Sequence, residues 1–204
     1  MSEKDRMTSG KVYDCLDDEL SKAREKVSEL CIIYNSLPDG HKDRIGIIKQ
    51  IFPNMDETSI IRGPVFADYG FNTYIGKNSY ANFNLTILDV CKVVIGDNVS
   101  IGPNVSLITV VHPLLKDERK SSYRKECKSV DQYGKPITIG NDVWLGCGVI
   151  VLPGITIHDN VVVGAGSVVT HDLESGSIYV GNPAKKLREI TPEDSILLKK
   201  GLLD

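Results

Sequence analysis

Aliphatic residues recur every six positions through the second half of the chain, and this spacing constrains the fold more than any other feature of the sequence. Turn-forming pairs such as Asn141-Asp142 and Pro153-Gly154 separate the aliphatic positions. An α-helix would need a period of about 3.6 residues and a simple strand a period of two, so neither fits. The unbroken series consists of Ile139, Leu145, Val151, Ile157, Val163 and Val169.

This period is typical of a parallel β-helix built from hexapeptide repeats. Each hexad supplies a short strand and a corner, and three hexads make one triangular coil. Successive coils stack about 4.8 Å apart, with the aliphatic residues pointing inward. An upstream block has the same interval and contains a two-residue slip, at Ile75, Ala81 and Ile87 and then at Ile95, Ile101 and Leu107. We therefore predict a mainly β fold with a parallel β-helix over residues 56–185, in preference to ordinary antiparallel strands.

The two ends of the chain differ from this pattern. Residues 3–35 carry apolar side chains at helical spacing, and residues 41–52 form a further short helical pattern that ends at Pro53. We therefore expect a helical N-terminal module over residues 1–55. Thr191 followed by Pro192 is a typical helix start, which predicts a short C-terminal helix within a tail of residues 186–204.

Composition excludes several classes of protein. The 204 residues suffice for one domain with a small appendage, and the net charge of -3 gives no indication of a nucleic-acid partner. The five cysteines are widely spaced and odd in number, which favours reduced thiols in the cytoplasm over a disulfide scaffold. The charged N-terminus does not resemble a signal peptide, and no apolar run approaches the roughly 20 residues of a membrane span. We expect a soluble cytoplasmic protein.

The hexad pattern is interrupted between Leu107 and Ile139. Residues 112–136 contain no aliphatic series, which predicts a long loop extruded from one corner. His112 stands at the base of this loop, where the rigid coil can hold it. An imidazole with a pKa of about 6.5 is suited to accept a proton near neutral pH. From spacing alone, His112 is either a general base or a corner residue before Pro113 with no chemical role.

Several motifs in one order resemble the hexapeptide-repeat acyltransferases, most closely the maltose and galactoside O-acetyltransferase group. The resemblance covers almost the whole chain and implies a left-handed β-helix, a homotrimer with sites between subunits, and acetyl-CoA as donor to a sugar hydroxyl, without a metal. It also implies direct transfer with His112 as the general base. Its motifs are "DYGFNTYIG" (68–76), "YANFNLTILD" (80–89), "VHPL" (111–114), "GKPITIGNDVWLG" (134–146), "GAGSVVTHD" (164–172) and "VGNPAKKLREI" (180–190).

On the acceptor side, the resemblance assigns Asn82 to the reacting centre, in contact with both substrate and cofactor. Asn82 precedes His112 by thirty residues, close to two coils with a slip, so we expect the two to stack near the same edge. Asp68 and Asp89 would bind sugar hydroxyls, since carboxylates accept strong hydrogen bonds. Val90 stands where galactoside-type enzymes carry a second acid, which favours the maltose and glucose branch.

On the donor side, the resemblance places the pantetheine arm against the backbone of Cys147 and Ala165. The Cys147 N–H would stabilise the oxyanion, whereas its thiol is not expected to act as a nucleophile. Trp144 would form a wall of the acceptor or cofactor site, or else be a structural cap. The nucleotide end would be contacted by Thr170, His171, Lys185 and Arg188.

Three alternatives stay open at this point. The acceptor could be a non-sugar hydroxyl of a xenobiotic or of serine, or an amino sugar. A γ-carbonic-anhydrase-like zinc enzyme would use the same fold, but it needs three converging histidines. His112, His158 and His171 do not have the spacing of the close pair expected for such a site. The third alternative is a trimeric scaffold without catalytic activity.

Overall fold

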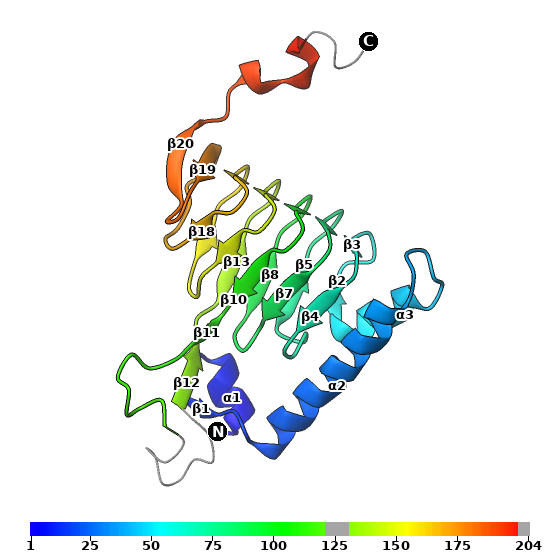
Figure 1. Cartoon of the computed structure of the whole chain (residues 1–204), viewed down its shortest axis with the longest axis vertical. Coiled ribbons are helices and arrows are strands. Elements are labelled where there is room, and N and C mark those ends of the chain that lie inside the picture. Colours follow the sequence, from blue (N-terminus) through cyan, green and yellow to red (C-terminus); the bar gives the residue numbers. More distant parts are fainter. Residues whose placement is uncertain (121–130, 200–204) are drawn as a thin grey trace.

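Three sheets, parallel except for the last strand β20, form the faces of a triangular prism, a left-handed β-helix of about six turns (Figure 1). The computed structural model describes residues 1–120 and 131–199. Face 1 contains β4 (Val65–Ala67), β7 (Leu85–Leu88), β10 (Ser106–Ile108), β15 (Ile150–Val151) and β18 (Val168–Val169). Face 2 contains β2 (Asn54–Met55), β5 (Thr73–Ile75), β8 (Val93–Ile95), β13 (Ile137–Ile139) and β16 (Thr156–Ile157). Face 3 contains β3 (Ile60–Ile61), β6 (Tyr80–Ala81), β9 (Ser100–Ile101), β14 (Trp144–Leu145), β17 (Val162–Val163), β19 (Ser177–Val180) and β20 (Lys185–Glu189).

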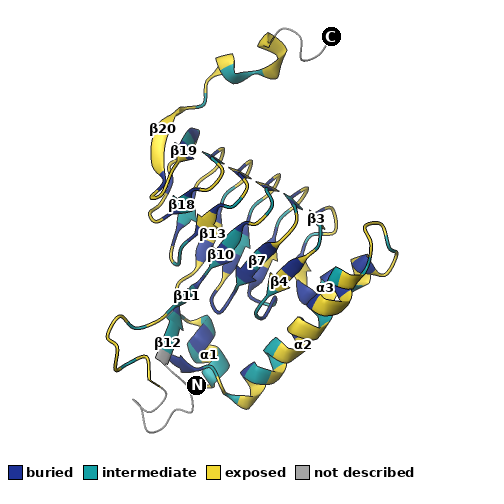
Figure 2. Cartoon of the chain, viewed as in Figure 1, coloured by how far each residue is buried: buried dark blue, intermediate teal, exposed yellow. Residues whose placement is uncertain are grey.

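The hexad aliphatics form the interior of the prism, as the sequence predicts. Ile139 pairs with Ile157 one coil later, and Leu145 pairs in the same way with Val163. These residues are buried in one continuous apolar core that extends from the first coil to the last (Figure 2). Because each coil repeats the same inward positions, the pattern of burial sets the register of all three faces.

The prism has three edges. In chain order, edge A connects face 3 to face 1, edge B connects face 1 to face 2, and edge C connects face 2 to face 3. The register shows where the hexad period fails. Ile75 pairs with Ile95, twenty residues on, and Ile95 pairs with Ile139, forty-four residues on. Edges A and C have short connections of three or four residues in every described coil. The two-residue slip and the interruption after Leu107 therefore both lie at edge B.

The N-terminal module covers one end of the prism and part of edge B. It comprises α1 (Glu3–Thr8), β1 (Tyr13–Asp14), α2 (Asp18–Ser36) and α3 (Arg44–Ile51). The Asp17 carboxylate caps α2 by accepting from the backbone N–H groups of Glu19 and Leu20. Buried residues of α2 and α3 join the prism core, so these helices close its first coil. A second apolar cluster joins the module to edge B and contains Met7, Tyr13, Leu20, Tyr69 and Val90.

The chain after edge B leaves the prism as a strand pair. β11 (Val110–Val111) pairs antiparallel with β12 (Asp131–Gly134), which pairs in turn with β1. The last part of the predicted loop 112–136 is thus a strand that ties the N-terminal module to edge B, and residues 121–130 lie outside the described residues.

The C-terminal segment differs from the predicted helix. β20 crosses the predicted boundary at residue 186, and two short 3-10 helices follow, η1 (Pro192–Asp194) and η2 (Ile196–Leu198). Ile196, Leu197 and Leu198 are exposed, so the segment has no packed face to support a longer helix. Across residues 1–120 and 131–199, no helix combines the length and apolarity needed to cross a bilayer.

Candidate functional site

The predicted site residues lie in two groups on different edges of the prism. Asn82, Cys147 and Ala165 lie on edge A, in the second, fourth and fifth coils. Their stacking follows from the backbone ladder: Asn82 N–H donates to Ile101 O at 2.9 Å, and the next coils repeat this bond. Gly102 N–H donates to Leu145 O at 2.8 Å, and Gly146 N–H to Val163 O at 2.8 Å.

Edge A presents backbone groups more than side chains. A Cβ on Gly102 would lie 2.8 Å from Cys147 N, and one on Gly146 would lie 2.6 Å from Ala165 N. Only glycine therefore allows the coils to stack this closely. Within the described residues, the Cys147 N–H has no acceptor, and Cys147 itself is exposed. This N–H is free to donate to a bound molecule.

Trp144 lies on face 3 immediately before edge A, in β14. Its side chain is 56% exposed although its strand is held on both sides by β9 and β17. An aromatic side chain of this exposure on a rigid strand provides a surface for a ligand or for another protein chain.

Asp89 lies on edge B and is fully buried. Its carboxylate accepts from Tyr69 N–H at 2.8 Å, Gly70 N–H at 3.1 Å and Thr73 Oγ1 at 3.0 Å. Burial raises the pKa of Asp89 to about 6, against the lowering effect of these hydrogen bonds. The carboxylate thus holds the widened corner together, and a sugar hydroxyl would have to compete with these donors.

Asp68, also on edge B, has a different environment. Its half-buried carboxylate has no hydrogen bond or ion pair within residues 1–120 and 131–199. Burial raises the pKa of Asp68, and the charge of Arg24 from α2 opposes this effect. An ionised Asp68 would therefore be stabilised by donors from a bound molecule.

The N-terminal module supplies polar groups that reasoning from the sequence missed. Arg24 Nη1 donates to Tyr69 Oη at 2.5 Å, and its Nη2 donates to Cys15 O at 2.6 Å. Arg24 thus joins α2, the chain after β1 and edge B in one network beside Asp68. No repeat or spacing in the sequence indicates this contact, because it depends on how the module packs against the prism.

His112 follows β11 directly and is exposed. Its imidazole has no hydrogen bond or ion pair in the part of the chain that the structure describes. From Val105 on edge A, the chain runs along face 1 and past edge B to His112, seven residue steps that span roughly 23 Å when extended. The expectation that Asn82 and His112 stack near one edge is therefore wrong within a single chain. They lie at opposite sides of face 1.

The predicted nucleotide contacts divide in the same way. Thr170 and His171 lie on edge B in the fifth coil, whereas Lys185 and Arg188 lie in β20, which returns across face 3. Arg188 forms a two-point ion pair with Asp194, with N–O distances of 2.6 and 2.7 Å. The cofactor residues thus also come from both sides of face 1.

The histidines do not converge on a metal site. His158 lies on edge C, away from His112 and His171 on the side of edge B. Among the described residues, no group of three metal-ligating side chains is present.

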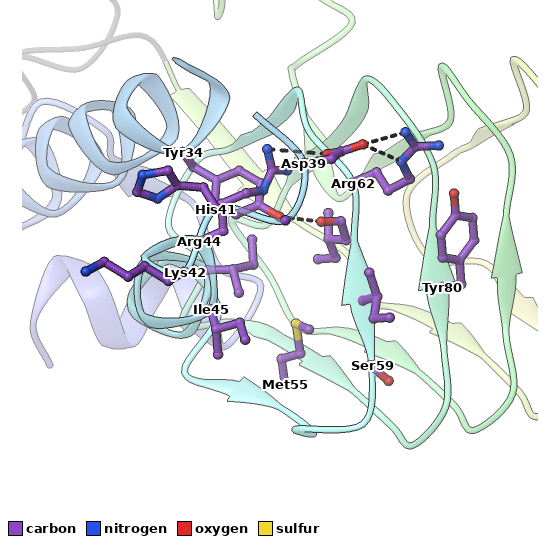
Figure 3. A pocket seen from close by; sticks show the side chains of 14 residues that line it. Tyr34, Asp39, His41, Lys42, Arg44, Ile45, Met55, Ser59, Arg62 and Tyr80 are labelled. Carbon is purple, nitrogen blue, oxygen red and sulfur yellow. Dashed lines mark hydrogen bonds and ion pairs between the residues drawn. The ribbon is translucent and has the colours of Figure 1, made fainter. Parts of the chain in front are cut away.

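A hollow of about 440 Å³ lies elsewhere, between α3 and the first coils of face 3 (Figure 3). One end of it carries Asp39, which accepts from Arg62 Nε at 2.9 Å and lies 3.5 Å from Arg44 Nη1. None of the predicted site residues lines this hollow.

Comparison with known proteins identifies the family. Residues 6–56 match the maltose acetyltransferase hexapeptide capping motif, and residues 136–171 match the bacterial transferase hexapeptide model of six repeats. The chain is 40% identical over 191 residues to galactoside O-acetyltransferase of Escherichia coli, covering 93% of this chain and 90% of that protein. The chain belongs to the maltose and galactoside O-acetyltransferase group of the hexapeptide-repeat acetyltransferases.

Solved structures agree with this assignment. A maltose O-acetyltransferase from Clostridium difficile has a TM-score of 0.85 and 41% identity, with 94% of this chain and 98% of that chain covered. A galactoside acetyltransferase in complex with coenzyme A has a TM-score of 0.85 and 39% identity, with 95% and 94% covered. The predicted fold class is thereby confirmed.

Proposed function

We propose that this protein transfers an acetyl group from acetyl-CoA to a hydroxyl of a sugar, in a groove between two copies of the chain. One observation carries the proposal: the residues that the reaction needs lie on two edges of the prism. His112 and Asp68 lie at edge B, and Asn82 and the free Cys147 N–H lie at edge A. A second copy that places its edge A against edge B of the first would complete the site.

The chemistry follows from the groups at these edges. His112 accepts the proton of the acceptor hydroxyl as its oxygen attacks the thioester carbonyl carbon. The Cys147 N–H donates to the oxyanion of the tetrahedral intermediate, and Asn82 orients the reacting groups. When the intermediate collapses, the carbon–sulfur bond breaks and the protonated His112 returns the proton to the CoA thiolate. The thioester is already activated, so no covalent enzyme intermediate and no metal is required.

Acceptor binding would involve Asp68 and the N-terminal module. Asp68 has an unpartnered carboxylate beside Arg24, which suits it to a sugar hydroxyl. Val90 is buried in the second apolar cluster, so no second acid stands at that position. We therefore expect maltose or glucose to be a better acceptor than a galactoside. Turnover with a panel of sugars, serine and antibiotic alcohols, followed by release of the CoA thiol, tests this order.

Each copy has one edge A and one edge B, so the contact between copies is heterologous. Such contacts close into a ring when the rotation between copies allows it, and three copies give a homotrimer with three equivalent sites. We place this trimer in the cytoplasm, where the reduced state of the four described cysteines would be maintained.

Mixing of inactive variants tests the shared site. His112→Ala and Asn82→Ala chains, each inactive alone, are refolded together in equal amounts. If the site lies between copies, random assembly restores about a quarter of wild-type sites. An intact site needs edge B from an Asn82→Ala chain and edge A from a His112→Ala chain, and each of these chains fills its place in about half of the sites. A site within one chain would give no recovery. Size measurement of the mixture must show trimers, and a protein that remains a single copy while active contradicts the proposal.

A further inference from the structure

Arg188 in β20 is held along one side of its guanidinium group. Its Nη1 donates to Asp194 Oδ2 at 2.7 Å, and its Nη2 donates to Asp194 Oδ1 at 2.6 Å. The same Nη1 donates to Glu189 O at 2.9 Å. Two parallel bonds to one carboxylate fix the plane of the guanidinium as well as its position.

Asp194 is itself held in place. Its carboxylate accepts from Thr191 N–H at 3.0 Å, and its own N–H donates to Thr191 O at 3.0 Å. The hydrogen bonds from Arg188 and from Thr191 keep the pKa of Asp194 well below its usual range, so the carboxylate is ionised at neutral pH. The turn after β20 therefore presents a fixed acceptor to Arg188.

A count of the N–H donors of the Arg188 guanidinium shows which of them are available to a ligand. A guanidinium carries five N–H donors, and the bonds to Asp194 and Glu189 use three of them. The two that remain, the Nε–H and one hydrogen of Nη2, point in the same direction and form a second fork. Neither has an acceptor in residues 1–120 and 131–199, and the Arg188 side chain is 49% exposed. Such a fork matches two oxygens of a phosphate group.

We propose that Asp194 is a positioning residue, which orients Arg188 so that its Nε–Nη2 edge binds a phosphate group of the cofactor. The proposal rests on the proposed function, which assigns Arg188 to the nucleotide end of acetyl-CoA. Lys185, three residues earlier in β20, is exposed and has no ion pair among the described residues, so it adds a second positive charge. Because both members of the Arg188–Asp194 pair contact solvent, water screens the repulsion between Asp194 and a phosphate.

Steady-state kinetics with two donors tests this role. The donors are acetyl-CoA and acetylpantetheine, which lacks the nucleotide and all phosphates. We expect Arg188→Ala to raise the KM for acetyl-CoA about tenfold and Asp194→Asn to raise it about threefold to fivefold, in keeping with the loss of charge-assisted bonds. The kcat should change less than about twofold in both variants, because neither residue approaches the reacting atoms. With acetylpantetheine, both variants should match the wild type.

Further variants separate the positioning role of Asp194 from a general effect on the C-terminal tail. Glu193→Gln removes a neighbouring charge that does not contact Arg188, and it should leave both KM values unchanged. Arg188→Lys keeps the charge but has no fork, so adding Asp194→Asn to it should cause no further loss. Asp194→Glu, which keeps the carboxylate, should recover part of the affinity.

The outcomes distinguish the positioning role of Asp194 from the assignment of Arg188 to the cofactor. An unchanged or lower KM for acetyl-CoA in Asp194→Asn, with a raised KM in Arg188→Ala, overturns the positioning role alone. An unchanged KM in Arg188→Ala overturns the assignment of Arg188 to the cofactor, and the inference with it. A change that appears equally with acetylpantetheine means that the pair supports the fold of the tail, which also overturns the inference.

Discussion

Edges A and B of the prism are built from the same repeat but have opposite characters. Edge A connects its strands with three or four residues in every described coil, and its middle coils pass each other at glycine. Edge B has longer connections in the first two coils and the extruded segment in the third. Its connections in the last two coils are short, and in the fifth coil the chain returns to face 2 at Leu173, which bridges to Ile157. A regular edge offers a straight track of backbone groups for an extended molecule. An irregular edge has room for side chains such as Asp68 and His112.

Among the tests of this difference between edges A and B, His112→Ala should have the largest effect. We expect turnover to fall at least about a hundredfold, because general base catalysis contributes 10²–10⁴-fold. The KM for acetyl-CoA should be retained, since the track for the donor lies mainly on edge A. His158→Ala on edge C is the matched control and should keep full activity. A His112→Ala protein with near-normal turnover would remove the catalytic role from edge B.

Gly146→Ala tests the close stacking of edge A. The added Cβ would lie 2.6 Å from Ala165 N, a contact with backbone that no side-chain movement can relieve. We expect the free energy of unfolding to fall by about 1–3 kcal/mol, measured by urea denaturation. Ala165→Ser, at the exposed position next to it, should change stability by less than about 0.5 kcal/mol. Equal stability of Gly146→Ala and the wild type would show that edge A has more room than its backbone spacing indicates.

Asp68→Asn tests the acceptor side of edge B with a smaller expected effect. The amide keeps the size of the side chain but accepts hydrogen bonds more weakly than a carboxylate. We expect the KM for the sugar to rise about fivefold to tenfold, with the KM for acetyl-CoA unchanged. The reverse pattern, a change in the KM for acetyl-CoA alone, would place the donor at edge B.

The pH dependence of stability tests the other carboxylate of edge B. The pKa of Asp89 is about 6 in the folded chain, above its ordinary value of 3.8, so the folded state holds its proton more tightly than the unfolded state. The contribution of Asp89 is therefore greatest below about pH 4 and declines as the pH rises to about 6, by at most about 1.4 kcal/mol per pH unit.

Asp89→Asn should remove this decline. The amide oxygen can accept from Tyr69 and Gly70, and the amide nitrogen can donate to Thr73 Oγ1. Urea denaturation of both proteins at several pH values between 4 and 7 measures the difference. Parallel pH profiles would show that the Asp89 carboxylate is ionised throughout and that its three donors outweigh burial.

The sequence predicts the interior of this protein better than its site. Inward positions such as Ile139 and Leu145 repeat without exception, so the core and the register follow directly from the period. The edge on which a residue lies depends on the local coil length. At twenty residues a coil, the thirty residues from Asn82 to His112 make one and a half coils, which leads to a different edge. If these thirty residues are counted as two coils, Asn82 and His112 are wrongly placed on the same edge.

Contacts outside the repeat were not predictable from the sequence for a different reason. Arg24 reaches Tyr69 because the N-terminal module packs on edge B, and no local pattern encodes that packing. The C-terminal segment has a helix start at Thr191, but its exposed apolar residues have no partner surface on this chain among the described residues. The predicted short helix therefore takes the form of two 3-10 helices, η1 and η2.

The antiparallel direction of β20 has a consequence for solubility. A stack of parallel coils is a ladder that could in principle continue from one molecule into the next, as in a fibril. β20 is the last strand of face 3 and runs antiparallel to its neighbour β19, and four of its five residues are charged. A strand from a second molecule that continued the parallel stack would not match the direction of β20, and it would bury the charged side chains of β20. Both effects disfavour end-to-end polymerisation.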